Sequence, residues 1–504
     1  MNPRPERPGL ASTLRHIAAG RNSFFFGLAV VLPRVTGLLT LPIYTRLLGP
    51  EDFGRYELLT SISALLFATC VLGLDYAISV RFYPLDETDR RRDAASAVAV
   101  AAAASVGTAC ILGGLAGVLG PVALQSANGA LPFALTIVAV PFNVIGGVLA
   151  MSLRLRFMGR AFLRAMLAGA FGGAAVGLYL VVVADAGLAG AAFGLASIHV
   201  ITFALLAFGA RGWLDPRSAV RSTAVLLIRL GAPLVPAGTA MWVFAVADRF
   251  FVAGFLGFTQ LGLYAAAARL ATILVLIQFG FLAAWGPIAL RWGTLADRDR
   301  RYAVSLRLIA IVGGGLLAAV SWLAQPFLWL LAGPDYVAAS DVVWLLAASV
   351  LFSAMFFVVQ IGANLGQRGS RVALATVAAA VVNTVANLVL IPTLGYIGAG
   401  VATLAAYASA FGAMYAMSQT VTPIRLEVTR ATAWAVGWTV VAGLSVVVPA
   451  SIRPFAGLVV GVAAILIAVA GIVRIAPILA ASTPSDVGNQ LPDAPRPGDV
   501  GLLP

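Results

Sequence analysis

The sequence contains few charged residues, two cysteines, two histidines and no lysine. Only 11% of its 504 residues are charged and 61% are hydrophobic, whereas soluble domains are about a quarter charged and about half apolar. A chain this apolar has no stretch of polar sequence long enough to form a soluble domain. The composition therefore excludes a soluble globular protein and predicts one that lies in a membrane.

These scarcities also exclude several chemistries. Cys70 and Cys110 both fall inside apolar runs, so they cannot form a disulfide framework. Without lysine there is no phosphate-cradling Gly-Lys loop, and two histidines are too few for a metal cluster. No Gly-x-Ser-x-Gly elbow occurs either. ATP hydrolysis within this chain is therefore excluded, and we expect no cofactor.

Long apolar runs dominate the sequence instead. A bilayer-spanning helix needs roughly 20 apolar residues, and the sequence contains about fourteen such stretches. The pattern predicts an all-α polytopic membrane protein with about 14 transmembrane helices. The stretches are 23–43, 57–80, 96–119, 130–151, 163–184, 187–209, 226–247, 261–287, 303–323, 341–362, 372–391, 396–417, 431–449 and 455–475.

The basic residues, all of them arginine, test this assignment. Cytoplasmic loops of membrane proteins carry an excess of basic residues. Of the 33 arginines, 27 fall in the tails and in alternate loops, for example Arg90, Arg91 and Arg92, and 4 fall on the opposite side. The distribution predicts an even number of spans with both termini cytoplasmic. It also explains the net charge of +13 by topology, so nucleic acid is not expected as a partner.

Two short motifs recur at an offset of 208 residues. Residues 48–56 read LGPEDFGRY and residues 256–264 read LGFTQLGLY, while GLAGA at 187–191 corresponds to GYIGA at 395–399. Both matches lie at span boundaries, which indicates a duplicated six-helix unit. Because six is even, the copies form a parallel repeat around an axis along the membrane normal, as in two-lobed transporters. A scaffold whose duplication serves packing alone is the alternative.

The repeat predicts a domain organisation of two lobes with peripheral additions. We expect a cytoplasmic tail (1–22), an N-lobe with the first six spans (23–209), a cytoplasmic linker (210–225), a C-lobe with spans seven to twelve (226–417), two peripheral helices (418–476) and a Pro/Gly-rich disordered cytoplasmic tail (477–504).

Charged residues inside the predicted spans are the strongest functional signal. An arginine at mid-membrane costs about 2.5–3.5 kcal/mol on insertion scales, so Arg34 and Arg269 should face a cleft or a partner. They could bind an anionic substrate, because guanidinium groups grip phosphate with paired donors, or they could pair with Asp75 or Asp248 and join helices. Asp248 could instead couple ion movement, and Arg249 could anchor the protein at the membrane interface.

Neutral polar residues within the spans give a weaker signal. They could line a cavity for a sugar, or they could form hydrogen bonds between helices, which is the more common role and the one preferred for His199. Two of them, Asn383 and Asn387, are spaced to lie on one helix face. The residues considered for the cavity are Asn143, Gln278, Gln360, Asn383 and Asn387, with Asn364 as a further polar position.

Several segments resemble a known family. RVTGLLTLPIYTRLLGPEDFGRYELL and LGLDYAISVRFY in the first half, with ADRFF and LGLYAAAARLA in the second, are similar to Wzx-type polysaccharide flippases. These belong to the multidrug/oligosaccharidyl-lipid/polysaccharide (MOP, MATE-like) exporter superfamily. The resemblance spans roughly residues 23–420 and implies fourteen helices in two six-helix lobes plus two peripheral helices. In relatives that move the peptidoglycan precursor, arginines in the first and eighth spans line the cleft, and Arg34 and Arg269 occupy similar places.

The resemblance also implies a function. It predicts a flippase that moves undecaprenyl-diphosphate-linked oligosaccharide across the bacterial cytoplasmic membrane by alternating access, for O-antigen, capsule or exopolysaccharide synthesis. Expected partners are this lipid-linked substrate, membrane lipid, and a polysaccharide polymerase with its chain-length machinery. A proton or sodium gradient could reset the protein. The alternatives are a cation-coupled multidrug exporter of the same fold, a membrane glycan polymerase or ligase, and a flippase for the peptidoglycan precursor.

Overall fold

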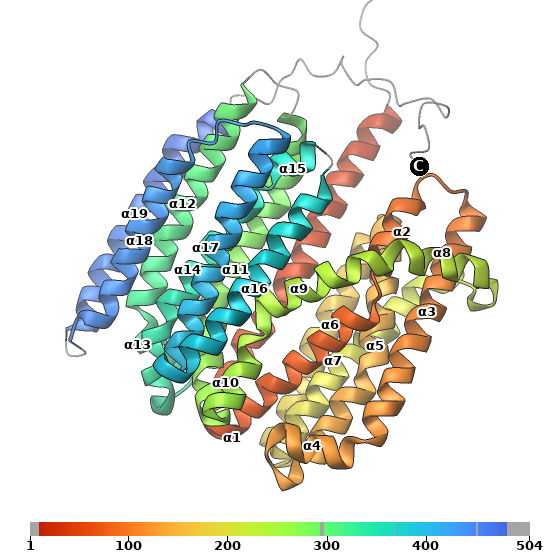
Figure 1. Cartoon of the computed structure of the whole chain (residues 1–504). Helices are drawn as coiled ribbons and strands as arrows, with labels where there is room; N and C mark the ends of the chain where they lie inside the picture. Colours follow the sequence, from red (N-terminus) through yellow and green to blue (C-terminus); the bar gives the residue numbers. More distant parts are fainter. Residues whose placement is uncertain (1–9, 293–296, 367, 450–451, 481–504) are drawn as a thin grey trace, which may run out of the picture.

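The computed structural model describes residues 10–292, 297–366, 368–449 and 452–480, and this part of the chain is helical without a β-strand. The helices form two bundles, which Figure 1 shows at the two sides of the view. The first bundle is built from α1 (Leu10–Cys70), α2 (Leu74–Phe82), α3 (Glu87–Gly114), α4 (Ala116–Leu124), η1 (Ala127–Gly129), α5 (Ala130–Leu155), α6 (Gly159–Val182) and α7 (Gly187–Ala210).

The second bundle follows a short connection that contains η2 (Pro216–Ser218). Its last two helices pack mainly on α12 and lie at the outer edge in Figure 1, as predicted for peripheral helices. α8 (Arg221–Gly231) packs on α2 and α3 and lies beside the first bundle in Figure 1. The second bundle is built from η3 (Ala232–Leu234), α9 (Val235–Val246), α10 (Asp248–Leu256), α11 (Phe258–Trp292), α12 (Arg298–Trp322), α13 (Ala324–Leu331), η4 (Pro334–Ala339), α14 (Ser340–Val359), α15 (Ile361–Leu365), α16 (Gly369–Leu394), α17 (Tyr396–Val421), α18 (Val428–Val447) and α19 (Arg453–Ala480).

The first predicted span (23–43) and most of the second (57–80) lie in α1, which consists of two helices joined at Gly49, and the end of the second span lies in α2. The chain reverses direction at Gly49, whose φ of 69° and ψ of 175° are not helical. In Figure 1, α1 descends between the bundles and returns beside the first one. Positive φ is readily adopted by glycine, so a single residue makes the turn and the loop predicted between residues 43 and 57 is helical on both sides of it.

The seventh predicted span is broken into α8, η3 and α9. Pro233 and Pro236 lie at the starts of η3 and α9, respectively. Proline lacks the backbone N–H that an uninterrupted helix needs, so the helix breaks at these positions. By contrast, α5 continues through Pro141. Broken helices in membranes occur where the interrupted backbone is buried in protein or lines a cavity, and the second case applies here, as described below.

The two halves fold alike. Gly49 and Gly257 share nearly the same backbone angles, and Gly187 and Gly395 both have positive φ. Each pair is separated by the offset of the sequence repeat. Helix packing repeats as well: α7 packs on α6 and α5 just as α17 packs on α16 and α14. This is the arrangement expected of a duplicated unit, while the domain boundaries stay a prediction.

Eleven helices in the described part of the chain are long and apolar enough to cross a membrane, so the protein is a multi-pass membrane protein. The number fourteen stays a prediction, because α1 counts once, the seventh span is interrupted, and the apolar part of α19 is shorter, at Phe455–Gly471. The start of α1 and the end of α19 lie at the same end of the bundles in Figure 1. The predicted tails outside residues 10–480 lie outside the described residues.

Candidate functional site

Arg34 and Arg269 lie at the same contact, between α1 and α11. Arg269 donates a hydrogen bond from Nη1 to the carbonyl oxygen of Gly37, over 2.8 Å. The Arg34 guanidinium lies over the ring of Phe279 on α11, 4.3 Å from its centre. Each arginine therefore reaches across to the other helix. The structure brings the two predicted substrate-binding residues to one interface between the two halves of the chain.

The partner of Arg269 is Glu57, which the sequence analysis did not single out. Arg269 Nε donates to Glu57 Oε1 over 2.7 Å, and Glu57 is only 5% exposed. The alternative that Arg269 pairs with Asp75 or Asp248 is not found among the described salt bridges, in which Arg269 pairs with Glu57. Glu57 stands at the first position of the predicted second span, where a carboxylate resembles the polar end of a loop, and no local signal distinguishes it.

Asp248 and Arg249 extend this ion pair into a network. Asp248 is 6% exposed and accepts a hydrogen bond from the Tyr264 hydroxyl. Arg249 lies 3.2 Å from Asp248 and 3.8 Å from Glu57. The network Asp248–Arg249–Glu57–Arg269 thus alternates in charge and joins α1, α10 and α11. Arg249, predicted as a possible interface anchor, is a structural bridge between two buried carboxylates.

Aromatic rings surround the Arg269 end of this network. The Arg269 guanidinium lies 5.1 Å from the centre of the Phe53 ring and 5.7 Å from that of Tyr56. Cations are attracted to aromatic faces, more strongly where water is excluded. The rings therefore help to hold a charge in an apolar environment, where an unpaired charge would be costly.

Next to the network, the backbones of the two halves touch at equivalent glycines. A Cβ atom on Gly54 would lie 2.0 Å from the carbonyl oxygen of Phe258, and one on Gly262 would lie 1.9 Å from that of Pro50. Gly54 and Gly262, like Pro50 and Phe258, are related by the repeat offset. The contact is therefore reciprocal, and it closes the interface between the halves at the end where α1 turns.

Asp75 lies elsewhere, in a cavity of about 460 Å³ between the two bundles. Asp75 is exposed and forms no salt bridge within the described residues. The neighbouring Tyr76 is 51% exposed. The cavity is lined by residues of α1, α2, the break between them, η3, α9 and α16: Phe67, Ala68, Val71, Gly73, Asp75, Tyr76, Leu234, Val235, Gly238, Met241, Gly369, Val372, Ala373 and Thr376.

The residues predicted to line a sugar cavity are scattered. Asn383 and Asn387 share one face of α16 as predicted and are joined by a hydrogen bond of 3.0 Å, with exposures of 1% and 0%. Asn383 Nδ2 and Asn387 Oδ1 have no further partner among the described atoms. Gln360 donates to Asn364 at the end of α14. Asn143 is half-buried on α5.

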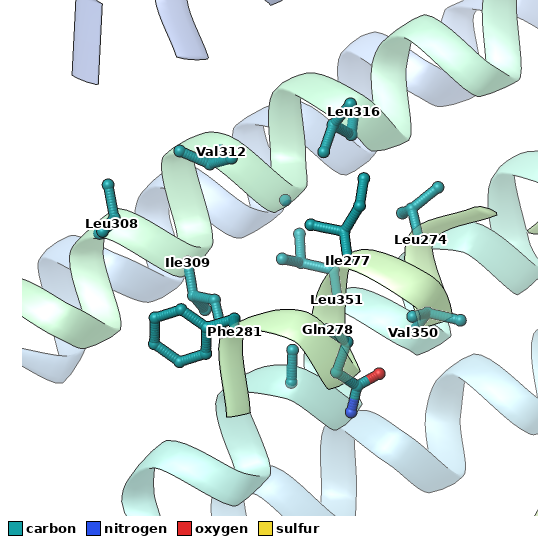
Figure 2. Close-up of a pocket in the computed structure, with 12 residues that line it drawn as sticks. Leu274, Ile277, Gln278, Phe281, Leu308, Ile309, Val312, Leu316, Val350 and Leu351 are labelled. Carbon is teal, nitrogen blue, oxygen red and sulfur yellow. The ribbon is translucent and has the colours of Figure 1, made fainter. Parts of the chain in front are cut away.

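Gln278 and His199 lie within the bundles. Gln278 borders an apolar pocket of about 180 Å³ between α11, α12 and α14, and Figure 2 shows its amide pointing away from α12. Its Nε2 donates to Ser353 Oγ over 3.1 Å, so the amide joins α11 to α14. His199 lies 3.3 Å from Ser63 Oγ, in agreement with the preferred role of joining helices. None of these residues lines the cavity that contains Asp75.

The described helices form the two bundles of a multi-pass membrane protein, with a charged, buried network at their interface. Solved structures confirm the fold. The chain is similar to the lipid II flippase MurJ in an inward closed conformation, with a TM-score of 0.68 and 13% identity over 90% of this chain and 98% of that one. A multidrug resistance MATE family transporter of the MOP superfamily, in its inward-facing conformation, matches with a TM-score of 0.62 and 13% identity, over 81% of this chain and 98% of that one. A MOP superfamily transporter from Pyrococcus furiosus matches with a TM-score of 0.60 and 14% identity, over 83% of this chain and 96% of that one.

The chain belongs to the family described as polysaccharide biosynthesis protein, whose sequence profile matches residues 19–291, more than half of the chain. No curated protein sequence matches it. The family agrees with the predicted resemblance to polysaccharide flippases in its link to polysaccharide biosynthesis, and the fold is shared with solved proteins that are described as a lipid II flippase and a multidrug transporter.

Proposed function

We propose that this protein is a flippase for undecaprenyl-diphosphate-linked oligosaccharide in the bacterial cytoplasmic membrane, acting in surface polysaccharide synthesis. Membership of a polysaccharide biosynthesis family supports the substrate class. The observation that carries the proposal is the position of Arg34 and Arg269, which reach across the contact between α1 and α11 from opposite helices. A polymerase and its chain-length machinery would receive the product.

The two arginines would bind the diphosphate of the substrate. Guanidinium groups form paired, charge-assisted hydrogen bonds with phosphate oxygens, and these are stronger away from water. Glu57 holds Arg269 at 2.7 Å, so an arriving diphosphate would have to displace this carboxylate. Because the ion pair joins α1 to α11, the displacement would loosen the same contact that transport must open.

Transport would then follow by alternating access. The network and the reciprocal glycine contact hold the halves together at the Gly49 end of the interface, while the cavity between the bundles lies at the break between α1 and α2. Rocking of the two lobes would part the glycine contact and close the cavity. A ligand shifts such an equilibrium only through different affinities for the two states, and the exchange at Arg269 would supply that difference.

Substitution of Arg34 tests the proposal in a strain that lacks the gene. Arg34→Ala is expected to reduce rescue of the surface polysaccharide at least about tenfold, because a bond to a charged group contributes about 1.5–3 kcal/mol. The lipid-linked oligosaccharide should accumulate in the inner leaflet of sealed spheroplasts. Arg34→Lys should rescue partly, since lysine keeps the charge but lacks the planar fork.

The matched control is Arg160→Ala, an exposed arginine on α6, which should transport like the wild type. Full activity of Arg34→Ala would contradict the assignment of this residue. If deletion of the gene changed drug susceptibility and left the lipid pool in both leaflets unchanged, the multidrug exporter would replace the flippase. Single repeats that reach the outer leaflet unpolymerised would favour a polymerase.

We also propose that a proton or sodium gradient resets the transporter and that Asp248 couples it. The support is the burial of this carboxylate and its place in the network that joins the halves. Asp248→Asn preserves shape and removes the charge. It is expected to abolish the stimulation of flipping by an imposed ion gradient in proteoliposomes and to leave slower, gradient-independent flipping. Unchanged stimulation would rule Asp248 out.

A further inference from the structure

The break between α1 and α2 lines the cavity that contains Asp75. α1 ends at Cys70 and α2 begins at Leu74, with Gly73 in the left-handed region at a φ of 67°. A Cβ on Gly73 would lie 2.4 Å from the carbonyl oxygen of Gly231, the last residue of α8. The interruptions of the second and seventh predicted spans therefore meet, and the cavity lies beside them. Discontinuous helices at the interface of two repeats commonly form substrate sites.

The charge of this cavity determines what it can bind. Among its described lining residues, Asp75 is the one charged side chain. An ionised carboxylate only accepts hydrogen bonds, so a ligand here must present donors, and a phosphate would be repelled. The charge of Asp75 acts on Arg154 at the end of α5, but the two form no salt bridge among those described. The diphosphate therefore belongs with Arg34 and Arg269, and a different part of the substrate belongs here.

The size and the remaining lining indicate a sugar. About 460 Å³ lies within the range of roughly 300–1,000 Å³ that is typical of small-molecule sites. Tyr76 is 51% exposed and adjoins the carboxylate, and the walls from α9 and α16 are apolar or small. A sugar ring has apolar C–H faces, which suit the aromatic ring of Tyr76, and hydroxyl groups at its edge, which can donate to Asp75. In ligand sites that are mostly apolar, a few polar groups of this kind fix the orientation of the ligand.

We propose that this cavity binds a sugar ring of the lipid-linked oligosaccharide, with Asp75 accepting hydrogen bonds from its hydroxyl or amide donors and Tyr76 contacting its apolar face. This rests on the proposed function and adds to it the residues that recognise the glycan. It also differs from the sequence-based expectation, which assigned the glycan to asparagine and glutamine residues that lie outside this cavity.

The cavity walls give the sugar a role in transport. α1 and α2 belong to the first half of the chain, whereas η3, α9 and α16 belong to the second. A sugar bound here contacts both halves, so rocking of the lobes changes its contacts. Recognition of the glycan is thereby linked to the conformational change, and a lipid diphosphate without sugar would lack that link.

The test compares two lipids on the purified full-length protein in nanodiscs: undecaprenyl diphosphate, and the same lipid carrying one N-acetylhexosamine. The wild type is expected to bind the glycosylated lipid more tightly. Asp75→Asn should reduce this preference at least about fivefold, since hydrogen bonds to charged groups are among the stronger ones. Tyr76→Ala should also reduce it, because the aromatic face that contacts the sugar ring is lost. Affinity for the bare lipid should change less than about twofold.

Tyr179→Ala is the matched control, because Tyr179 is a tyrosine on α6 with 61% exposure that does not line the cavity; its preference should equal that of the wild type. An unchanged preference in both cavity variants would overturn the proposal. An equal loss of affinity for the two lipids would also overturn it, because it would indicate a structural role for these residues. If the wild type bound neither lipid, the proposed function itself would fail. Binding of both lipids without preference would overturn the sugar site alone.

Discussion

Replacing Gly54 with alanine is expected to abolish most transport, because the added methyl group has no space. Its Cβ would lie 2.0 Å from the carbonyl oxygen of Phe258, which is backbone, so α1 and α11 would have to separate. Overpacking costs about 1–3 kcal/mol, a factor of about 5 to 150 in the population of the state that makes this contact. Rescue of the surface polysaccharide in the deletion strain measures the loss.

Thiol labelling distinguishes an opened interface from a misfolded protein. In a background with Cys70 and Cys110 replaced by alanine, a cysteine substituted for Thr45, which is 1% exposed, should react slowly with an impermeant maleimide. Gly54→Ala should accelerate this reaction by about the same factor by which it lowers the population of the state that makes the Gly54 contact. Gly412→Ala on α17 is the control, because nothing lies within 4 Å of its added Cβ. Wild-type transport and labelling in Gly54→Ala would contradict a close contact during the transport cycle.

The symmetry of the contact extends this expectation to Gly262. Its Cβ would lie 1.9 Å from the carbonyl oxygen of Pro50, so Gly262→Ala should show the same defect. Because both substitutions part the same two backbones, their combined effect should be less than the sum of the single effects. The sequence repeat identified these glycines as equivalent, and the structure shows that the equivalent positions meet.

The general fold could be predicted because its determinants are local or periodic. Span length, the alternation of arginines and a motif repeated at one offset each reflect the bilayer or the duplication. The helix face shared by Asn383 and Asn387 follows from their spacing of four residues and is confirmed. Proline by itself does not determine where a helix breaks: the chain is interrupted at Pro233 and Pro236, yet α5 passes through Pro141, since neighbouring groups can satisfy the freed carbonyl.

The candidate site could be predicted only in part, because its contacts join distant segments. The cost of burying a charge identified Arg34, Arg269 and Asp248 as residues that need partners, but it does not say which partners. Glu57 and Arg269 are 212 positions apart, and a residue at the edge of a predicted span looks like an ordinary interfacial acid. Likewise, the contact of Asp75 with a cavity depends on how α2, α9 and α16 meet, which no single segment encodes.

A paired substitution at Glu57 and Arg269 separates the structural role of this ion pair from its role in transport. Arg269→Ala alone is expected to lower both thermal stability and transport, because it leaves Glu57 buried with Arg249 at 3.8 Å as its remaining basic partner. Breaking a buried ion pair costs about 3–5 kcal/mol, whereas replacing both members by apolar residues is often neutral. The double variant Glu57→Leu/Arg269→Met should therefore regain most of the lost melting temperature.

If Arg269 binds the diphosphate, the double variant should regain stability without regaining transport. The double variant is expected to stay at least about tenfold below the wild type in polysaccharide rescue and in affinity for undecaprenyl diphosphate. The control is the same exchange at Asp93, which is buried, and its half-buried partner Arg81, as Asp93→Leu/Arg81→Met. These two side chains lie 2.7 Å apart within the first bundle, and the variant should transport normally. Glu57→Gln should bind the diphosphate more tightly than the wild type, because the competing carboxylate is gone. A stable double variant that transports fully would reduce Arg269 to a helix-joining residue, and the diphosphate site would then have to lie elsewhere.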